Sequence, residues 1–288
     1  MTKGTKCMKK KRTERKIIYH ILVAIFGLIM IYPLVWMIMS SFKETGTIFT
    51  TAGRLIPETF TLENYINGWK GFAGIGFGTF FKNSLFISIV ATIGTVFSSS
   101  IVAYGLARCK FRGKRILIVA MLLSMMLPAQ VLMIPQYLWY QKLGWVNSYL
   151  PLIIPYCFAI QGFFTYLMMN FIQGIPRELD EAAKIDGCSY YGIFRRIIFP
   201  LMVPVLITSG IFSFMWRWDD FLSALLYIND SAKYPVSLAL KLFSDPGSSS
   251  DYGAMFAMAT LSILPIILIF IFLQKYIVEG ISTSGLKG

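Results

Sequence analysis

Residues 254–278 read AMFAMATLSILPIILIFIFLQKYIV, a run in which Lys275 is the only charged side chain. An α-helix rises ~1.5 Å per residue, so a run of this length reaches across the ~30 Å hydrocarbon core of a bilayer. A backbone in that core must satisfy its own hydrogen bonds, and a single apolar segment does so as a helix. The stretch therefore predicts a transmembrane helix and places the chain among membrane proteins.

Five further stretches of the 288 residues have the same character. They lie near 17–41, 83–107, 116–139, 149–173 and 200–226. The composition agrees, because 56% of residues are hydrophobic, the mean hydropathy is +0.64 and only 14% are charged, against roughly 25% in soluble domains. We predict an all-α polytopic membrane protein with six transmembrane helices between residues 17 and 278. A basic tail, 1–16, precedes them and a short tail, 279–288, follows.

The positions of lysine and arginine predict the orientation of these helices. They gather in alternate segments, with eight in 1–16, five in 108–115, four in 174–199, and Lys275 and Lys287 near the C-terminus. The intervening loops carry only six. Because positively charged loops stay in the cytoplasm, both termini and the segment 174–200 are predicted to be cytoplasmic. This asymmetry accounts for most of the net charge of +13, so no nucleic-acid partner is needed to explain it.

The chain lacks the residue groupings of an enzyme or a metal protein. Its four cysteines have no CxxC spacing and His20 is its only histidine, so we expect free thiols and no metal site. Carboxylates lie mainly at helix ends, which argues against catalytic residues inside the membrane. No GxxxxGK[ST] phosphate loop is present, so nucleotide chemistry would belong to another polypeptide. An ion-coupled secondary transporter, or another polytopic membrane protein, remains the alternative, although no clear internal repeat supports it.

The loop between the fourth and fifth stretches reads GIPRELDEAAKIDG over residues 174–187. Pro176 suits the first position of a helix, the acidic residues that follow suit its positive N-terminus, and Gly187 suits a left-handed stop. A second amphipathic piece, 189–199, leads to Pro200. The loop is therefore predicted to hold a helix–loop–helix element. Its first helix could enter a groove on a soluble partner or lie on the lipid headgroups, and both interpretations stay open.

Polar side chains inside the predicted spans are costly and often line a transport pathway. The candidates are Gln130, Gln136, Gln161, Trp216, Arg217, Asp219 and Asp220. Pro128 and Pro135 each remove a backbone hydrogen bond and are predicted to kink the helix 116–139. Counted along its helix, the cluster 216–220 lies near the outer interface, where an aromatic belt with locally paired charges is the alternative. The glutamines suit contacts between helices equally well.

The loop carries a spaced motif, Glu181-Ala182-Ala183, then Gly187, then Ile197-Ile198-Phe199-Pro200. This spacing resembles the signature of inner-membrane permeases of binding-protein-dependent ABC importers, with Phe199 in place of leucine. Further segments are similar to the maltose-type, carbohydrate-uptake branch of that family. They are YGLAR at 104–108, LPAQVLMIP at 127–135, WDDF at 218–221, where Asp219 replaces the usual asparagine, and the tail 279–288, which resembles that of the second permease.

The resemblance implies that Glu181 forms a salt bridge with an ATPase subunit and that the loop sits in a cleft of that subunit. The motif positions are Glu181, Ala182, Ala183, Asp186, Gly187 and Pro200. ATP-driven closure of the ATPases would switch the permease pair from inward- to outward-facing. The implied partners are a second homologous permease, two ATPase subunits, which would bind ATP and Mg, and an extracytoplasmic sugar-binding protein at the loop 227–253. This chain would bind no cofactor and catalyse no reaction.

The resemblance also implies a location and a substrate class. The chain would import sugars across a bacterial cytoplasmic (inner) membrane, and oligosaccharides are expected over monosaccharides. The string WRWDDF at 216–221 is similar to permeases for uronic-acid-containing oligosaccharides. Arg217 would give that similarity a physical basis if it faces the cavity, since arginine pairs well with carboxylates.

Overall fold

The structure, a computed structural model, describes residues 3–243 and 251–285. These residues form helices, with one isolated β-bridge between Phe72 and Ile75 and no named strand among them. Two predictions fall partly outside the described residues: the contact of the loop 227–253 with a binding protein and the resemblance of the tail 279–288 to that of a second permease. The all-α architecture predicted from the sequence is confirmed.

The chain divides into two compact units, which are described separately. The first unit comprises the residues up to Lys70 together with Phe243–Leu261. It contains α1 (Lys3–Ser40), a 3-10 turn (Thr45–Thr47), α2 (Glu63–Lys70) and the beginning of α14 (Tyr252–Gly285). Asn64 fixes the end of α1 in this unit, because its side-chain amide donates to the carbonyl oxygens of Ser41 at 2.8 Å and Lys43 at 2.6 Å.

The apolar residues of α1 between Ile17 and Tyr32 are exposed within the chain on every side of the helix. A helix that is apolar all round requires an apolar environment, either lipid or another apolar protein surface. This is the pattern expected of a membrane span, and it agrees with the first predicted stretch.

The second unit comprises Gly71–Leu242 and the part of α14 from Ser262 onward. Its helices are α3 (Phe77–Arg108), α4 (Lys114–Met126), α5 (Ala129–Lys142), α6 (Leu150–Ile153), α7 (Gly162–Gly174), α8 (Glu178–Ile185), α9 (Tyr190–Ile193), α10 (Phe199–Leu201), α11 (Val203–Trp218), α12 (Phe221–Tyr227) and α13 (Val236–Leu242). Short 3-10 turns cover Ile154–Phe158 and Ser231–Lys233, and a π-turn covers Phe194–Ile198.

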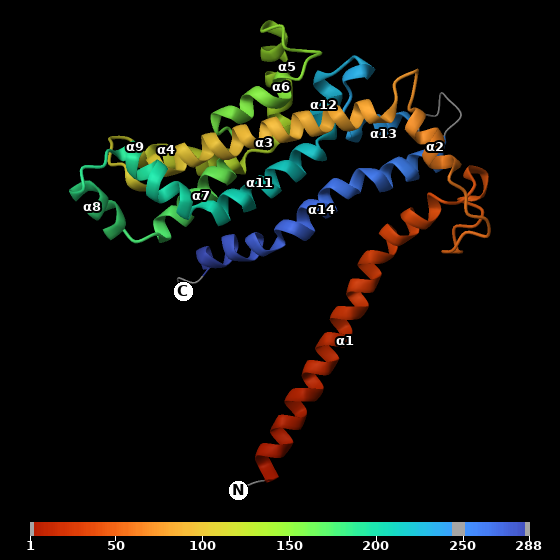
Figure 1. Cartoon of the computed structure of the whole chain (residues 1–288), viewed down its shortest axis with the longest axis horizontal. Helices are drawn as coiled ribbons and strands as arrows, with labels where there is room; N and C mark the ends of the chain where they lie inside the picture. The colour runs from red at the N-terminus through yellow and green to blue at the C-terminus, as the bar shows by residue number, and fades with distance from the viewer. Residues whose placement is uncertain (1–2, 244–250, 286–288) are drawn as a thin grey trace. The chain divides into compact units, whose positions relative to one another are not determined.

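The long helix α3 is the centre of this unit, with α7 and α11 packed along it (Figure 1). The packed faces of α3 carry small residues, including the buried Ser88, Ala91 and Ser99. Gly94 allows an especially close approach, because a Cβ at this position would lie 2.5 Å from the sulfur of Cys157. Small residues are common where helices meet inside a membrane. In lipid the hydrophobic effect does not drive helices together, and close packing of their backbones stabilises the contact instead.

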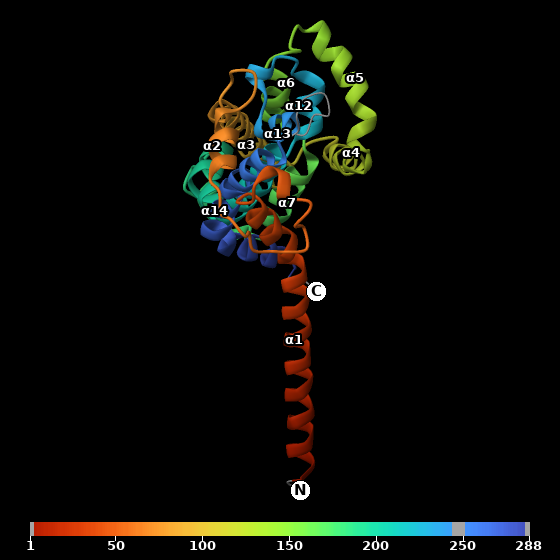
Figure 2. The same cartoon turned by 90° about the vertical axis from the view of Figure 1, so that its right-hand side faces the viewer.

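The third predicted span, 116–139, is not one continuous helix, and it breaks at the first of the two prolines that were predicted to kink it. It is divided into α4 and α5, which meet at an angle of 102° (Figure 2). Leu127 adopts an extended conformation, with ψ at 126°, directly before Pro128. A proline disfavours the helical conformation of the preceding residue, which explains the position of the break. Pro135, also predicted to bend the span, lies inside α5.

The fifth predicted span, 200–226, is also divided. The helical segment Tyr190–Leu201 meets α11 at an angle of 73°, near the donor-less nitrogens of Pro200 and Pro204. α11 ends at Trp218, and α12 begins at Phe221 after an irregular step. Asp220 caps α12, because its carboxylate accepts a hydrogen bond of 3.1 Å from the Ser223 N–H.

Among the residues that the structure describes, four helical stretches are long and apolar enough to cross a membrane, and up to six are if each bent pair counts as one span. The four are 16–40, 77–108, 150–174 and 252–276, and the bent pairs are α4 with α5, and 190–201 with α11. The upper count equals the six spans predicted from the sequence, whereas the number of spans and the sidedness of the termini stay predictions.

Candidate functional site

The motif loop forms the short helix α8, which begins later than the sequence suggested. Pro176 was expected at the first helical position, but α8 starts at Glu178, and the N–H groups of Asp180 and Glu181 bond to the Arg177 carbonyl at 3.0 and 3.1 Å. Three carboxylates lie in the first turn of α8, where the helix dipole favours negative charge. Gly187 ends the helix with φ at +81°, a left-handed conformation that suits glycine.

The two faces of α8 differ sharply in burial. Asp180 and Ala183 are buried, and Ala183 belongs to a core cluster with Tyr104 and Ile193. The opposite face is exposed and includes Glu181, Ala182, Ile185 and Asp186, with Ile185 86% exposed. We call these four residues the docking face. The sequence alone had grouped both alanines with this surface, whereas Ala183 lies in the chain's own core.

Sequence reasoning missed the residue that holds the buried face of α8. Arg108, the last residue of α3, places its Nε 2.9 Å from the carboxylate of Asp180. Its Nη2 donates to the carbonyl of Ile175 at 2.7 Å, and the Tyr104 hydroxyl donates to the carbonyl of Tyr190 at 3.1 Å. Arg108 had been counted as a loop charge and as part of the YGLAR segment, but no local pattern links it to Asp180.

The second part of the motif lies next to α8 in sequence but not on the docking face. Ser189 caps α9 by accepting a hydrogen bond of 3.2 Å from the Gly192 N–H. Pro200 is exposed and lies in α10, directly after the π-turn. A π-turn leaves room for a residue that cannot donate its backbone N–H, which accounts for the irregular backbone before Pro200.

A cavity of about 810 Å³ opens where α5, α7, α11 and α12 come together in the second unit. Its wall contains nearly all the polar residues that the sequence marked as pathway candidates. They are Gln136, Gln161, Trp216, Arg217, Asp219 and Asp220. Gln130 is exposed and does not line this cavity. The breaks at 127–128 and 219–220 bring these positions to one wall, which straight helices would not have done.

Arg217 is held in the cavity wall by two contacts. Its Nη1 lies 3.0 Å from the Asp220 carboxylate, and its guanidinium carbon lies 4.1 Å from the centre of the Tyr156 ring. A cation over a ring face at this distance is attracted by the ring quadrupole. Since Asp219 adds a further carboxylate without an ion-pair partner in the described part of the chain, the two acids outnumber the one base here.

Aromatic rings form the rest of the wall. Trp216 is 42% exposed, and its ring centroid lies 5.3 Å from that of Phe163 and 5.1 Å from that of Phe164. Packed against these two rings, the partly exposed indole of Trp216 lines the cavity. A flat apolar face beside charged and amide groups suits a ligand with both C–H and hydroxyl surfaces, such as a sugar.

The cavity also contains tyrosines that the sequence did not single out. Tyr227 donates from its hydroxyl to the Gln136 side-chain oxygen at 3.4 Å. The Tyr227 hydroxyl thus acts as a hydrogen-bond donor in the cavity wall. Residues from two distant segments meet here, so no local pattern could have identified the pair.

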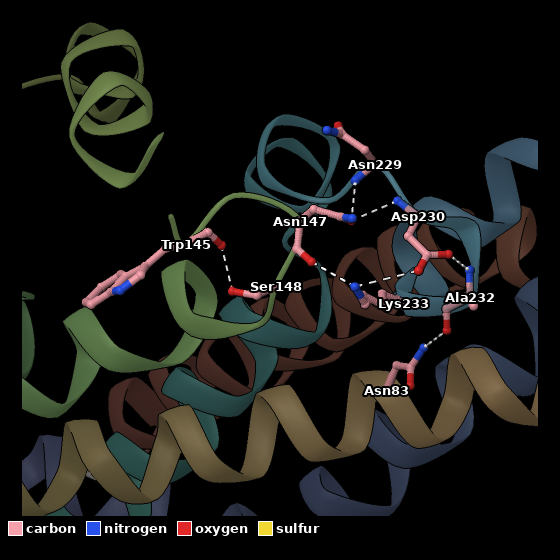
Figure 3. A network of polar contacts seen from close by, with 8 residues as sticks. All are labelled: Asn83, Trp145, Asn147, Ser148, Asn229, Asp230, Ala232 and Lys233. Carbon is pink, nitrogen blue, oxygen red and sulfur yellow. Dashed lines mark hydrogen bonds and ion pairs between the residues drawn. The ribbon is translucent and has the colours of Figure 1, made fainter. Parts of the chain in front are cut away.

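A network of hydrogen bonds between loop residues, called the loop network, lies at the end of α3 opposite α8 (Figure 3). The Asn147 side-chain oxygen accepts from the N–H groups of Asn229 and Asp230 at 3.2 and 3.0 Å. Lys233 donates to the Asn147 carbonyl at 2.9 Å. The Asn83 amide, on α3, donates to the carbonyl of Ala232 at 2.9 Å. Within the predicted outer loop 227–253, residues 229–236 are thus held against α3 by hydrogen bonds.

Among the described residues, no three His, Cys, Asp or Glu side chains come together as ligands for a metal ion. The polar groups gather instead at the docking face, the cavity and the loop network.

Comparison with known proteins gives a consistent result. Residues 96–283 match the family model described as binding-protein-dependent transport system inner membrane component. The chain is 38% identical to the probable ABC transporter permease protein YurM of Bacillus subtilis, over 89% of this chain and 84% of that protein. It is 33% identical to the arabinooligosaccharides transport system permease protein AraQ of Halalkalibacterium halodurans, over 92% of this chain and 94% of that protein.

A solved structure has the same architecture. It is a chain of a bacterial ABC transporter involved in the import of the acidic polysaccharide alginate, superposed with a TM-score of 0.78 and 25% sequence identity. The match covers 92% of this chain and 98% of that one.

Proposed function

Because the chain belongs to the family of binding-protein-dependent transport system inner membrane components, we propose that it imports oligosaccharides as one of two permease subunits powered by separate ATPases. It is a multi-pass inner-membrane permease of the carbohydrate-uptake branch. Its permease relatives support the assignment of ATP hydrolysis, with ATP and Mg, to the separate subunits. The further partners in this proposal are a second, homologous permease and an extracytoplasmic sugar-binding protein.

The shape of α8 is the observation that carries the coupling proposal. α8 is anchored on one side by Asp180 and Ala183, and on the other it exposes the docking face. Ile185 is 86% exposed beside carboxylates, which is an unfavourable place for a large apolar side chain unless a partner covers it. A short helix with apolar and charged positions fits a groove on a soluble subunit. We assign this groove to the ATPase.

The cavity supports the substrate proposal. Its size and its mixture of tryptophan, tyrosine, amide and charged groups suit part of a carbohydrate chain. The cavity would be reached from one side of the membrane at a time, as the permease pair switches between inward- and outward-facing states.

The descriptions of similar proteins name sugars of different charge. One names arabinooligosaccharides, and another names the acidic polysaccharide alginate. Arg217 faces the cavity, which meets the physical condition for a uronic-acid-containing substrate. A sugar carboxylate would have to replace Asp220 beside Arg217, and Asp219 would oppose its approach. The charge balance of the wall therefore favours neutral oligosaccharides, with acidic ones admitted if the Arg217–Asp220 pair opens.

Reversal of the charge at Glu181 tests the coupling proposal. In the assembled importer, Glu181→Lys is expected to break the salt bridge to the ATPase and to uncouple ATP hydrolysis from sugar uptake. Uptake and ATP turnover stimulated by the loaded binding protein are measured in proteoliposomes. Glu63→Lys, the same change at an exposed position of α2, is the control. Normal sugar-stimulated turnover in Glu181→Lys would refute the assignment.

The importer proposal as a whole is tested by co-purification from the native membrane. A soluble ATPase and a second permease are expected to remain with the chain in mild detergent. A secondary transporter or an ion channel would be isolated without an ATPase.

A further inference from the structure

Arg108 joins three helices at the end of the unit that carries the docking face. It is the last residue of α3, it donates to the carbonyl of Ile175 at the end of α7, and it forms an ion pair with Asp180 in α8. The side chains of Arg108 and Asp180 are 4% and 11% exposed. A cation is favourable beside the unpaired carbonyls at a helix C-terminus, so Arg108 suits the ends of both α3 and α7.

The orientation of α8 depends on these contacts of Arg108. α8 has only 8 residues, and a helix of this length is not stable by itself in water. Its position must therefore come from tertiary contacts, which include the packing of Ala183 in the core, the ion pair of Asp180 with Arg108 and the contact of Lys184 with the Tyr190 ring. Packing of a small alanine leaves rotation and tilt poorly defined, whereas a buried ion pair constrains both.

Hydrogen bonds hold the other end of α3 to the loop 231–236. Asn83 donates to the carbonyls of Ala232 and Tyr234 at 2.9 and 3.1 Å, and the Ser84 hydroxyl accepts from the Val236 N–H at 2.8 Å. α3 is one helix of 32 residues and contains no proline. At ~1.5 Å per residue, Ser84 and Arg108 lie about 36 Å apart along it. α3 thus links α8 to the loop 231–236 as a continuous rod (Figure 1).

We propose that Arg108 is a positioning residue that locks α8 to α3, so that displacement of α8 moves α3 and the loop 231–236 together. This inference rests on the proposed docking of an ATPase at α8. The ion pair transmits the motion of the ATPase, since a loose α8 would tilt under load without moving α3. The loop network at Asn83 then carries the motion to the opposite end of the unit.

A purely structural role makes a different prediction. Loss of one partner of a buried ion pair leaves an uncompensated charge and destabilises the protein, whereas loss of both partners is far less harmful. If the pair only maintained the fold, the double variant would regain both stability and coupled transport. If it transmits motion, the double variant regains stability and stays uncoupled.

The experiment compares Arg108→Gln, Asp180→Asn and the double variant in the complete importer, reconstituted with its partner permease, ATPases and loaded binding protein. Thermal unfolding, ATPase co-purification and the number of ATP molecules hydrolysed per sugar imported are measured. The double variant is expected to retain the ATPase and most of its stability, while ATP consumption per sugar rises about fivefold or more, the lower range of coupling between sites. The control is Arg54→Gln with Glu58→Gln, which removes an ion pair whose side chains are 68% and 67% exposed.

The outcomes separate this inference from the proposed function. A wild-type chain that never retains an ATPase refutes the proposed function. If the wild type retains the ATPase, a double variant with normal ATP consumption per sugar overturns the transmission role of Arg108. A double variant that loses the ATPase overturns it as well, because the pair would then serve docking and not transmission.

Discussion

Trp216 and Arg217 are adjacent in sequence, and both side chains line the cavity. Trp216 is supported by Phe163 and Phe164, and Arg217 by Asp220 and Tyr156. An interfacial aromatic belt was the alternative for this cluster. The cavity wall accounts for the direction of both side chains, because neighbouring positions of α11 point only about 100° apart and can both line a cavity of this width.

Truncation of Trp216 should weaken sugar binding without affecting assembly. Trp216→Ala removes the exposed indole face, and aromatic contacts contribute about 0.5–1.5 kcal/mol, so the half-saturating sugar concentration should rise roughly two- to tenfold. Uptake kinetics in proteoliposomes measure the effect. Trp139→Ala is the matched control, because Trp139 is exposed on α5 and does not line the cavity. Unchanged kinetics in Trp216→Ala would favour the belt interpretation.

Arg217→Gln distinguishes the two classes of sugar. Charged hydrogen bonds contribute about 1.5–3 kcal/mol, so uptake of a uronic-acid-containing oligosaccharide should fall about tenfold or more. Uptake of a neutral oligosaccharide by the same variant is the control and should change much less. An equal loss for both sugars would mean that Arg217 maintains the wall through Asp220 and does not recognise a carboxylate.

Among the elements, α8 is the clearest case of a helix divided between two tasks. Its buried face requires a small side chain at position 183, because Ala183 is only 5% exposed and packs in the core cluster that contains Tyr104. Its other face is exposed and can contact a partner. The first part of the motif, Glu181-Ala182-Ala183, therefore combines a partner contact with an internal packing requirement. Helix propensity alone does not distinguish the two alanines.

Enlarging each alanine separates these tasks. Ala183→Leu inserts extra volume into a packed core and should destabilise the isolated permease by about 1–3 kcal/mol. Ala182→Leu, the same change on the exposed face of the same helix, should leave its unfolding temperature nearly unchanged. Thermal unfolding in detergent measures both. Equal destabilisation would contradict the assigned burial of Ala183.

On the scale of the whole molecule, the charge pattern and the fold together define opposite ends for the second unit. α8 lies at one end of α3, and α12 and α13 lie toward the other. The lysine and arginine bias predicts that the α8 end is cytoplasmic and that the loop 227–243 is external. The docking face and the loop network would then meet partners on opposite sides of the membrane.

Thiol labelling tests this sidedness. In a background with the four native cysteines replaced, Lys110→Cys in the basic loop 108–115 should react with a membrane-impermeant reagent only in inverted vesicles. Asn229→Cys should react only in intact spheroplasts. Both positions are exposed within the chain, so labelling reports the side of the membrane. Labelling of both from the same side would exclude the predicted topology.

The sequence by itself determined the membrane class, the six apolar stretches and the position of α8. Hydropathy, capping residues such as Gly187, and the motif spacing depend on residues that are close together in the sequence. They can therefore be interpreted without knowledge of the fold. Tertiary structure alone decided that the divided spans line a common cavity, that Ala183 turns inward, and that Arg108 holds Asp180. These features depend on which face of a helix meets which neighbour, and that choice is made by packing between segments far apart in the chain.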